Sequence, residues 1–220
     1  MSNETTATMN RTMEKESTKT GAVKRVNVRY ITVTGMLSAI AFILMYFDVK
    51  VPFMPNFISL DISELPALIG AFAMGPVSGV IICLIKNLLH LTISSTALVG
   101  ELSNFILGAS FVFTAGMIYK LKKTKKGAVI GSFAGAIVMA VISVFSNYFV
   151  VYPFYYNFMS KDSIIAAYQA ITPNINITNI LQCLIGFNMP FTFVKGMISV
   201  VITLLIYKHI SPLLKGRNNQ

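Results

Sequence analysis

Long uninterrupted blocks of apolar residues form the dominant pattern along this chain. Four of them, of 18 to 24 residues each, cover residues 30–47, 101–119, 127–150 and 184–207. An α-helix rises about 1.5 Å per residue, so each block is long enough to cross the roughly 30 Å hydrocarbon core of a bilayer. The blocks lack the narrow apolar stripe of a helix on a soluble domain. The pattern therefore predicts an all-α integral membrane protein.

A fifth apolar stretch, over residues 64–91, is interrupted by Gly75 and Pro76. Proline has no backbone N–H to continue a helix, and a Gly-Pro pair is typical of a turn. The stretch therefore divides into spans over 64–75 and 76–91, and we expect a helical hairpin that turns at this pair. Its first arm is short for a full crossing, which favours a tilted or partly re-entrant segment.

The basic residues are clustered at three places along the chain. Fourteen of the 18 lysines and arginines lie within residues 11–29, 120–126 and 208–217, and the formal net charge is +10. Basic clusters that flank apolar spans follow the positive-inside rule and do not indicate a nucleic-acid groove. The N-terminal cluster and the 120–126 loop then share the cytoplasmic side, which requires an even number of crossings between them.

The predicted fold class is therefore a bundle of six transmembrane helices with cytoplasmic N and C termini. We expect a polar, basic cytoplasmic tail over 1–28, a membrane domain over 29–210 and a second cytoplasmic tail over 211–220. The first segment lacks the apolar core of a secretory signal peptide, so it is interpreted as a tail that stays on the protein.

Composition narrows the class of function. Hydrophobic residues make up 55% of the chain, charged residues 12%, and the mean hydropathy is +0.69, which argues against a water-soluble enzyme. The motifs G-x-x-x-x-G-K-[ST], H-E-x-x-H and G-x-S-x-G are absent. We expect no enzyme activity, no metal and no cofactor, and a partner has to supply any ATP hydrolysis.

Two of the predicted outer loops have patterns of their own. The loop over 48–63 is rich in proline and aromatic residues, and the alternation of Val49, Val51 and Phe53 predicts a short extended lid. The loop over 151–182 contains a predicted short helix over 161–170, with Asp162 or Ser163 as its cap. Lids over a helical bundle indicate a ligand site beneath them.

Polar residues on one face of the last span support such a site. Asn188, Thr192, Lys195 and Ser199 follow a helical spacing and form one continuous stripe. A charged side chain at mid-membrane costs about 2.5 to 3.5 kcal/mol, so Lys195 requires a partner or a task. We favour contact with a ligand, with pairing to a carboxylate that fixes helix packing as the alternative.

Further polar groups lie toward the predicted outer ends of other spans. Lys86 and His90 are one turn apart; Lys86 is interpreted as a structural ion pair with Glu64 or Glu101, and His90 as an interfacial residue. The predicted substrate-binding residues, which combine amides, a carboxylate, a lysine, a hydroxyl and an aromatic ring, are Asn147, Lys195, Asn188, Thr192, Glu101, Asn104 and Tyr148. Helix capping is an equal alternative for Glu101, and an aromatic belt is the default role for the rings.

Small residues predict close helix approaches. Gly127, Gly131 and Gly135 repeat every four residues in the fifth span and are interpreted as internal packing. A second set of small residues in the first span is a candidate dock for another membrane subunit or a packing surface, and consists of Gly35, Ser38, Ala39 and Ala41.

Several separated motifs resemble one transporter family. The runs 60–80, 85–91, 100–105 (Gly-Glu-Leu-Ser-Asn-Phe) and 188–196 (Asn-Met-Pro-Phe-Thr-Phe-Val-Lys-Gly) occur in the order and spacing of the riboflavin-specific S components of energy-coupling factor (ECF) transporters. The resemblance covers residues 30–210. It implies a six-helix protein of the prokaryotic cell membrane that binds riboflavin from outside and delivers it inward.

The resemblance also implies partners and contacts. The partners are a membrane coupling subunit (T component) and two cytoplasmic ABC-type ATPases, with the coupling subunit meeting the small-residue patch at Gly35 and Ala39. It places an amide and a lysine against the flavin, here Asn147 and Lys195. The alternatives are an S component for another vitamin, such as thiamine or biotin, and a membrane scaffold whose polar stripe only orders helices.

Overall fold

The computed structural model describes residues 28–52, 54–55, 58–94, 98–157, 159–172 and 177–215. Residues 28–31 form the first turn of α2 and belong to a separate unit, while the described residues from Thr32 onward form one compact unit. The predicted basic tail lies outside the described residues except for Val28, as does Phe53 of the predicted lid.

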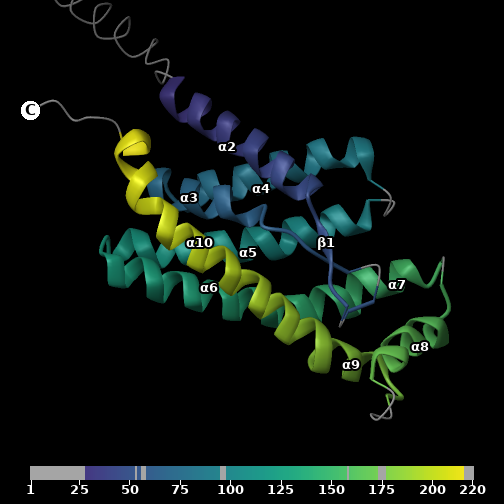
Figure 1. Cartoon of the computed structure of the whole chain (residues 1–220). Coiled ribbons are helices and arrows are strands. Elements are labelled where there is room, and N and C mark those ends of the chain that lie inside the picture. Colours follow the sequence, from purple (N-terminus) through teal and green to yellow (C-terminus); the bar gives the residue numbers. More distant parts are fainter. Residues whose placement is uncertain are drawn as a thin grey trace, which may run out of the picture. The chain divides into compact units, whose positions relative to one another are not determined.

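The elements are almost all helical (Figure 1). In chain order they are α2 (Val28–Tyr46), β1 (Val49–Lys50), β2 (Ser59–Leu60), α3 (Glu64–Met74), α4 (Pro76–His90), η1 (Leu91–Ile93), α5 (Val99–Leu121), α6 (Lys125–Ser146), η2 (Asn147–Val151), α7 (Tyr152–Tyr155), α8 (Lys161–Ile171), α9 (Ile180–Cys183), η3 (Leu184–Asn188) and α10 (Met189–Lys215). Helix α10 thus continues into the segment predicted as the C-terminal tail.

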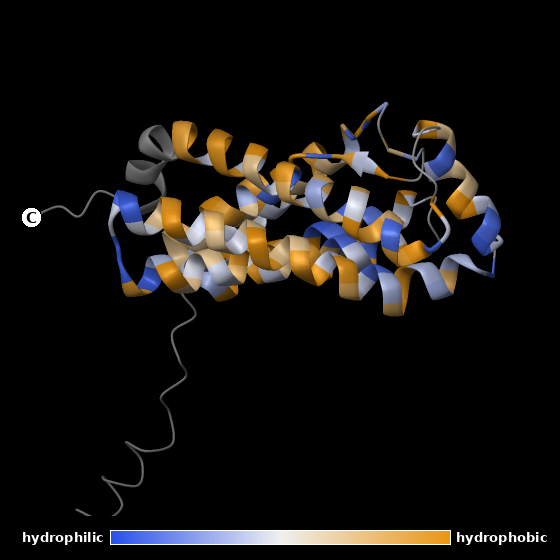
Figure 2. Cartoon of the chain, turned by 90° about the horizontal axis from the view of Figure 1, so that it is seen from below, coloured by the Kyte–Doolittle hydropathy of each residue, from blue (hydrophilic) through white to orange (hydrophobic). Residues whose placement is uncertain are grey.

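Five helical segments of the described chain are long and apolar enough to cross a membrane. They are Val28–Tyr46, Pro76–Ile93, Val99–Leu121, Lys125–Tyr155 and Ile180–Ile206, and α3 is a shorter apolar helix. Only 28% to 44% of the residues in each segment are buried inside the protein. Hydrophobic residues continue along the outward faces of the helices (Figure 2). Because water would make so much exposed apolar surface unfavourable, lipid is the solvent that fits these faces.

Helices α3 and α4 form the hairpin that the Gly-Pro pair predicts. Gly75 has a φ of 109°, a conformation that side chains on L-residues rarely adopt, and the Ser78 hydroxyl donates to its carbonyl oxygen at 2.7 Å. A Cβ atom on Gly79 would lie only 2.8 Å from the Cβ of Ala71. The two arms therefore lie in close contact along their length.

Two of the glycines predicted to pack internally lie where α5 and α6 come close together. A Cβ atom on Gly131 would lie 2.8 Å from the Ala115 carbonyl oxygen, and one on Gly135 would lie 2.7 Å from that of Phe111. The buried core of these helices includes Phe111, Val112 and Ala115 of α5. The backbones approach this closely only because glycine carries no side chain.

The β-strands, α7 and α8 gather at one end of the unit, which we call the strand end (Figure 1). Strand β1 pairs antiparallel with β2, so part of the predicted extended lid is a short hairpin. The opposite end, between α5 and α6, carries five exposed lysines and is called the lysine end; they are Lys120, Lys122, Lys123, Lys125 and Lys126.

Helix α8 occupies the place predicted for a short helix, but its cap differs. Ser160 is the N-cap, and its hydroxyl accepts the backbone N–H of Ser163 at 3.1 Å. The prediction of Asp162 or Ser163 as the cap is therefore wrong. Ser160 directly precedes the helix, so its side chain can reach an N–H group of the first turn that has no partner within the helix. Asp162 and Ser163 lie inside that turn and are not in the cap position.

Candidate functional site

A cavity of about 480 Å³ opens inside the bundle at its strand end. Its wall combines the end of α2, the β-hairpin, the start of α3, and parts of α5, α6, α7 and α10. Helix α3 has 11 residues and is therefore only about 16 Å long. Because α3 begins partway along the bundle, the chain leading into it from β2 lines the cavity.

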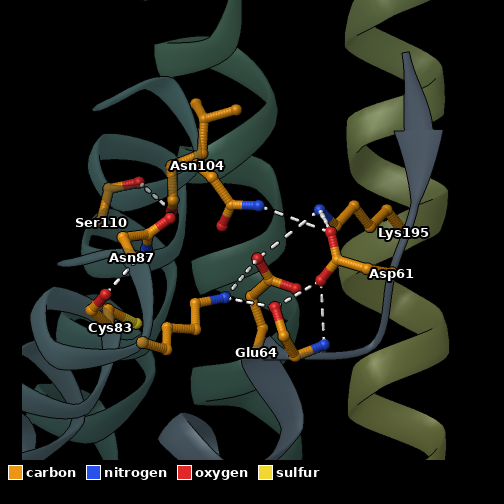
Figure 3. A network of polar contacts seen from close by, with 10 residues as sticks. Asp61, Glu64, Cys83, Asn87, Asn104, Ser110 and Lys195 are labelled. Carbon is orange, nitrogen blue, oxygen red and sulfur yellow. Dashed lines mark hydrogen bonds and ion pairs between the residues drawn. The ribbon is translucent and has the colours of Figure 1, made fainter. Parts of the chain in front are cut away.

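Four charged side chains meet at the start of α3 (Figure 3). The Lys195 ammonium lies 2.8 Å from Asp61 Oδ2 and 3.6 Å from Glu64 Oε1. Lys86 lies 3.3 Å from the same Glu64 oxygen and also donates to the hydroxyl of Ser63, which in turn contacts Asp61. Two carboxylates thus face two ammonium groups, and this balance makes their burial tolerable.

Burial and ion pairing shift the pKa of Asp61 in opposite directions. Its side chain is buried, which disfavours the charged carboxylate, but the charges of Lys195 and Lys86 lower the pKa of Asp61 well below its ordinary value. The backbone N–H of Ser63 donates to Asp61 Oδ1 at 3.0 Å and favours the same charged form. Asp61 is therefore a carboxylate on the cavity wall.

Two buried oxygen atoms beside this cluster lack a hydrogen-bond partner among the described residues. They are Glu64 Oε2 and Asn104 Oδ1, and both residues line the cavity. The Asn104 amide nitrogen donates weakly to Asp61 Oδ2 at 3.4 Å, which leaves its oxygen as an acceptor. Buried acceptors without partners are unfavourable, so a ligand with O–H or N–H groups would be stabilised here.

Two π-helical turns each place an asparagine on the cavity wall. Asn147 begins η2 and Asn188 ends η3, and both are largely buried. A π turn inserts one extra residue into a helix and rotates the side chains around it, and such turns recur at functional sites. The amides, which both donate and accept hydrogen bonds, are thus brought to the cavity by local departures from the α-helix.

A histidine and a glutamate in hydrogen-bond contact also line the cavity. His90 Nδ1 lies 2.9 Å from Glu101 Oε1, and Glu101 is in the first turn of α5, as predicted. No group of three or more His, Cys, Asp and Glu side chains in the described part of the chain is placed to hold a metal ion. The amides and carboxylates on the cavity wall suit an organic ligand with hydrogen-bonding edges.

Six of the seven predicted substrate-binding residues line this cavity: Asn147, Lys195, Asn188, Thr192, Glu101 and Asn104. Tyr148 does not line it; its side chain is 44% exposed and stacks edge-on against Phe149 with ring centroids 5.1 Å apart. Asn147 thus faces the cavity while the next residue faces outward. Ser199, the last member of the polar stripe, is buried deeper in the bundle.

Other predicted roles are resolved by the contacts. Lys86 forms the predicted structural ion pair with Glu64. Asp61 is the main partner of Lys195, and the sequence analysis did not single it out. Its position three residues before Glu64, within the run 60–80 that resembles the transporter family, was a signal that could have found it. Lys195 thus pairs with a carboxylate, as the alternative has it, and because it also lines the cavity its contact with a ligand stays a prediction.

The candidate docking residues divide between two faces of α2. Gly35 and Ala39 are exposed, whereas Ser38 and Ala41 are buried and face the rest of the bundle. The hydroxyl of Ser38 donates to the Thr34 carbonyl oxygen at 2.8 Å within the same helix. Ser38 and Ala41 are therefore packing residues, which corrects their assignment to a docking surface, and only Gly35 and Ala39 stay in that prediction.

Comparisons with known proteins match this chain to one protein family. Residues 29–207 match the family described as "ECF transporter, substrate-specific component". The riboflavin transporter RibU of Staphylococcus aureus is 36% identical over 189 residues, which cover 86% of this chain and 93% of that protein. The riboflavin transporter FmnP of Bacillus subtilis is 27% identical over 190 residues, covering 85% and 94%.

A solved structure agrees with these relatives. The S component of a bacterial ECF transporter superposes with a TM-score of 0.68 at 33% sequence identity and covers 87% of this chain and 100% of that chain. The resemblance identified from the separated sequence motifs is confirmed.

Proposed function

Because the chain belongs to the family of substrate-specific components of ECF transporters, we propose that it binds riboflavin in the strand-end cavity and delivers it inward. The single observation that carries the proposal is the cavity, which brings six predicted residues from α5, η2, η3 and α10 to one space of about 480 Å³. That volume lies within the range of small-molecule sites, roughly 300 to 1,000 Å³. Relatives named riboflavin transporters supply the choice of vitamin.

The charges on the cavity wall favour a ligand without a phosphate. Four carboxylates line the cavity, on Asp48, Asp61, Glu64 and Glu101, against the two lysines Lys50 and Lys195 and the ammonium of Lys86 that pairs with Glu64. A phosphate dianion would add negative charge to a wall that already has an excess of it. Riboflavin is uncharged, so it avoids this repulsion.

The polar groups match the two chemical parts of riboflavin. The partnerless oxygens of Glu64 and Asn104 would accept hydrogen bonds from the ribityl hydroxyls. The amides of Asn147 and Asn188, together with Lys195, would donate to the carbonyl oxygens of the flavin ring. Rings and apolar side chains on the same wall, among them Phe191, Tyr155 and Met45, would cover its apolar edge.

The topology that fits this function has six spans with both termini in the cytoplasm. Helices α2, α3, α4 and α5 give four crossings before the 120–126 loop, the even number that the positive-inside rule requires, and the two long segments after it bring the total to six. The lysine end would then be cytoplasmic, and the cavity would open at the outer, strand end. In this topology the segments 1–28 and 211–220 would be the two cytoplasmic tails, and 29–210 the membrane domain.

The partners that fit this function are a membrane coupling subunit and two ABC-type ATPases. Gly35 and Ala39, exposed on α2, remain candidate contacts for the coupling subunit. The chain would reside in the prokaryotic cell membrane as a multi-pass protein surrounded by lipid.

The test is a fluorescence-quenching titration of the purified protein with riboflavin, preceded by its absorption spectrum. We expect saturable quenching, and the yellow colour of co-purified flavin. Because the excess of carboxylates would also suit a cation, thiamine serves as one competitor, and biotin, which is an anion at neutral pH, serves as a second. Displacement by either one, or the absence of riboflavin binding at micromolar concentration, would overturn the proposal.

A further inference from the structure

One tyrosine of α8 contacts the cavity wall from behind. Tyr168 is fully buried and does not line the cavity. Its hydroxyl lies 2.7 Å from the hydroxyl of Tyr152 and donates to Asn188 Oδ1 at 2.5 Å. Tyr152 and Asn188 do line the cavity, and the Asn188 amide nitrogen donates to the Tyr152 hydroxyl at 3.4 Å. The three side chains therefore form a closed ring of hydrogen bonds.

The bond in which the Tyr168 hydroxyl donates to Asn188 sets the direction of the other hydrogen bonds in the ring. Since the Tyr168 hydroxyl gives its only hydrogen to Asn188, it accepts the hydrogen of Tyr152. Tyr152 in turn accepts one N–H of the Asn188 amide. This arrangement engages the amide oxygen and one amide hydrogen of Asn188 within the ring. The second N–H of Asn188 is left as the group that a ligand can use.

The ring also joins α8 to the membrane helices. Of the 11 residues of α8, only Ile164 and Tyr168 are buried. They pack in a cluster with Tyr152, Cys183 and Leu184, next to the two π turns. Burial raises the pKa of the Tyr168 phenol above its ordinary value, so the hydroxyl keeps its hydrogen at all physiological pH values. Tyr168 is thus the buried polar anchor of α8.

We propose that Tyr168 is a positioning residue, which fixes the orientation of the Asn188 amide so that it presents an N–H donor to the ligand. The inference rests on the proposed function, since it assigns how one wall of the same cavity recognises riboflavin. It makes two claims: Tyr168 acts through Asn188, and Asn188 serves as a donor.

The first test is a double-mutant cycle on riboflavin affinity. We expect Tyr168→Phe to weaken binding about tenfold, the loss typical of a buried hydrogen bond. In an Asn188→Ala background the same change should alter affinity less than twofold, because the residue it acts through is gone. Tyr156→Phe, which removes a nearby tyrosine hydroxyl outside the ring, is the matched control and should bind as the parent does. An equal loss in both backgrounds, or none in either, would overturn the inference.

A second variant tests the donor claim even if Tyr168→Phe folds poorly. Asn188→Asp keeps an acceptor for the Tyr168 hydroxyl but has no N–H to donate. It should bind riboflavin as weakly as Asn188→Ala. Affinity close to that of the parent would contradict a donor role for Asn188.

A ligand-free measurement separates this inference from the proposed function. In protein labelled with ¹⁵N-asparagine, the side-chain amide signal of Asn188 is identified by its loss in Asn188→Ala. Tyr168→Phe should shift that signal, and Tyr156→Phe should leave it in place. An unshifted signal in Tyr168→Phe would overturn the positioning role even if the parent protein binds riboflavin. A shift in a protein that ignores riboflavin would support the positioning role while the proposed function fails.

Discussion

At the scale of single residues, the ion pair between Lys195 and Asp61 is expected to contribute both to folding stability and to riboflavin binding. The two residues are 134 positions apart in the chain, and the ammonium lies 2.8 Å from the carboxylate on the cavity wall. Removing one member of a buried pair leaves the other charge without compensation, which costs about 3 to 5 kcal/mol. The same change also removes a donor from the cavity.

Lys195→Met should therefore lower both thermal stability and riboflavin affinity. The double variant Lys195→Met with Asp61→Asn should recover most of the stability, because no charge is left unpaired, but not the affinity. Thermal unfolding in detergent and the quenching titration measure the two effects. Lys122→Met, at the exposed lysine end, is the control and should change neither. A double variant as unstable as the single one would contradict this account.

The depressed pKa of Asp61 predicts a pH dependence with a definite sign. Its ordinary value is 3.8, and the neighbouring lysines hold the pKa of the folded-state carboxyl below that. A group whose pKa is lower in the folded state contributes stability above its unfolded value and loses it as the pH falls toward the folded value. The Asp61 contribution should thus be constant above about pH 5 and decline below about pH 4.

Unfolding temperatures between pH 3 and pH 7 check this prediction. Asp61→Asn in the Lys195→Met background should flatten part of the acid limb, since the titrating carboxylate is absent. The Lys50→Met variant provides the comparison, because Lys50 and its partner Asp48 are exposed. An acid limb unchanged by the loss of Asp61 would assign the decline to other carboxylates.

At the scale of elements, the hairpin between α3 and α4 depends on one backbone conformation. Gly75 has a positive φ of 109° between two helices that pack against each other. Forcing an L-residue into such a conformation costs about 1 to 3 kcal/mol. The start of α3 carries the charge cluster, so a shift of this hairpin would also disturb the cavity.

Gly75→Ala should consequently lower the unfolding temperature and weaken riboflavin binding together. Gly35→Ala is the matched control, because a Cβ atom there meets nothing within 4 Å and its φ is ordinary. That variant should be as stable as the parent or slightly more so, since alanine favours helix. Equal stability of the two variants would mean that the turn tolerates a side chain.

At the scale of the whole molecule, the proposed topology places the two ends of the bundle on opposite sides of the membrane. Single cysteines introduced at Lys122 and at Lys161 report on the lysine end and on α8, respectively. In intact cells, a membrane-impermeant maleimide should label the cysteine at 161 and spare the one at 122. The parent protein is the control, because Cys83 and Cys183 are buried. Labelling at 122 alone would invert the topology.

The charge of the cavity as a whole predicts discrimination against phosphorylated flavin. With four carboxylates on its wall against two lysines there and Lys86 beside Glu64, the cavity should bind flavin mononucleotide at least about tenfold more weakly than riboflavin. Competition titrations measure the ratio, and Glu101→Gln should narrow it. Equal affinity for the two flavins would show that the phosphate stays outside the cavity.

Much of the fold and part of the site follow from local sequence. Helical periodicity places Asn188, Thr192 and Lys195 on one face, and a polar face of a membrane helix has to turn inward, whatever its partners are. Tyr148 does not line the cavity although Asn147 does, because consecutive residues of a helical segment point in different directions. The π turns at η2 and η3 are themselves not visible in a regular helical count.

The sequence by itself determined that lipid is the solvent, that the chain turns at Gly75, and that the family is a transporter one, because each depends on a contiguous run or on the order of motifs. The tertiary structure alone decided that Asp61 pairs with Lys195, that Ser38 and Ala41 face inward, and that Tyr168 supports Asn188. Spacing along a helix defines a face of that helix. Contacts between distant segments arise only when the segments pack together.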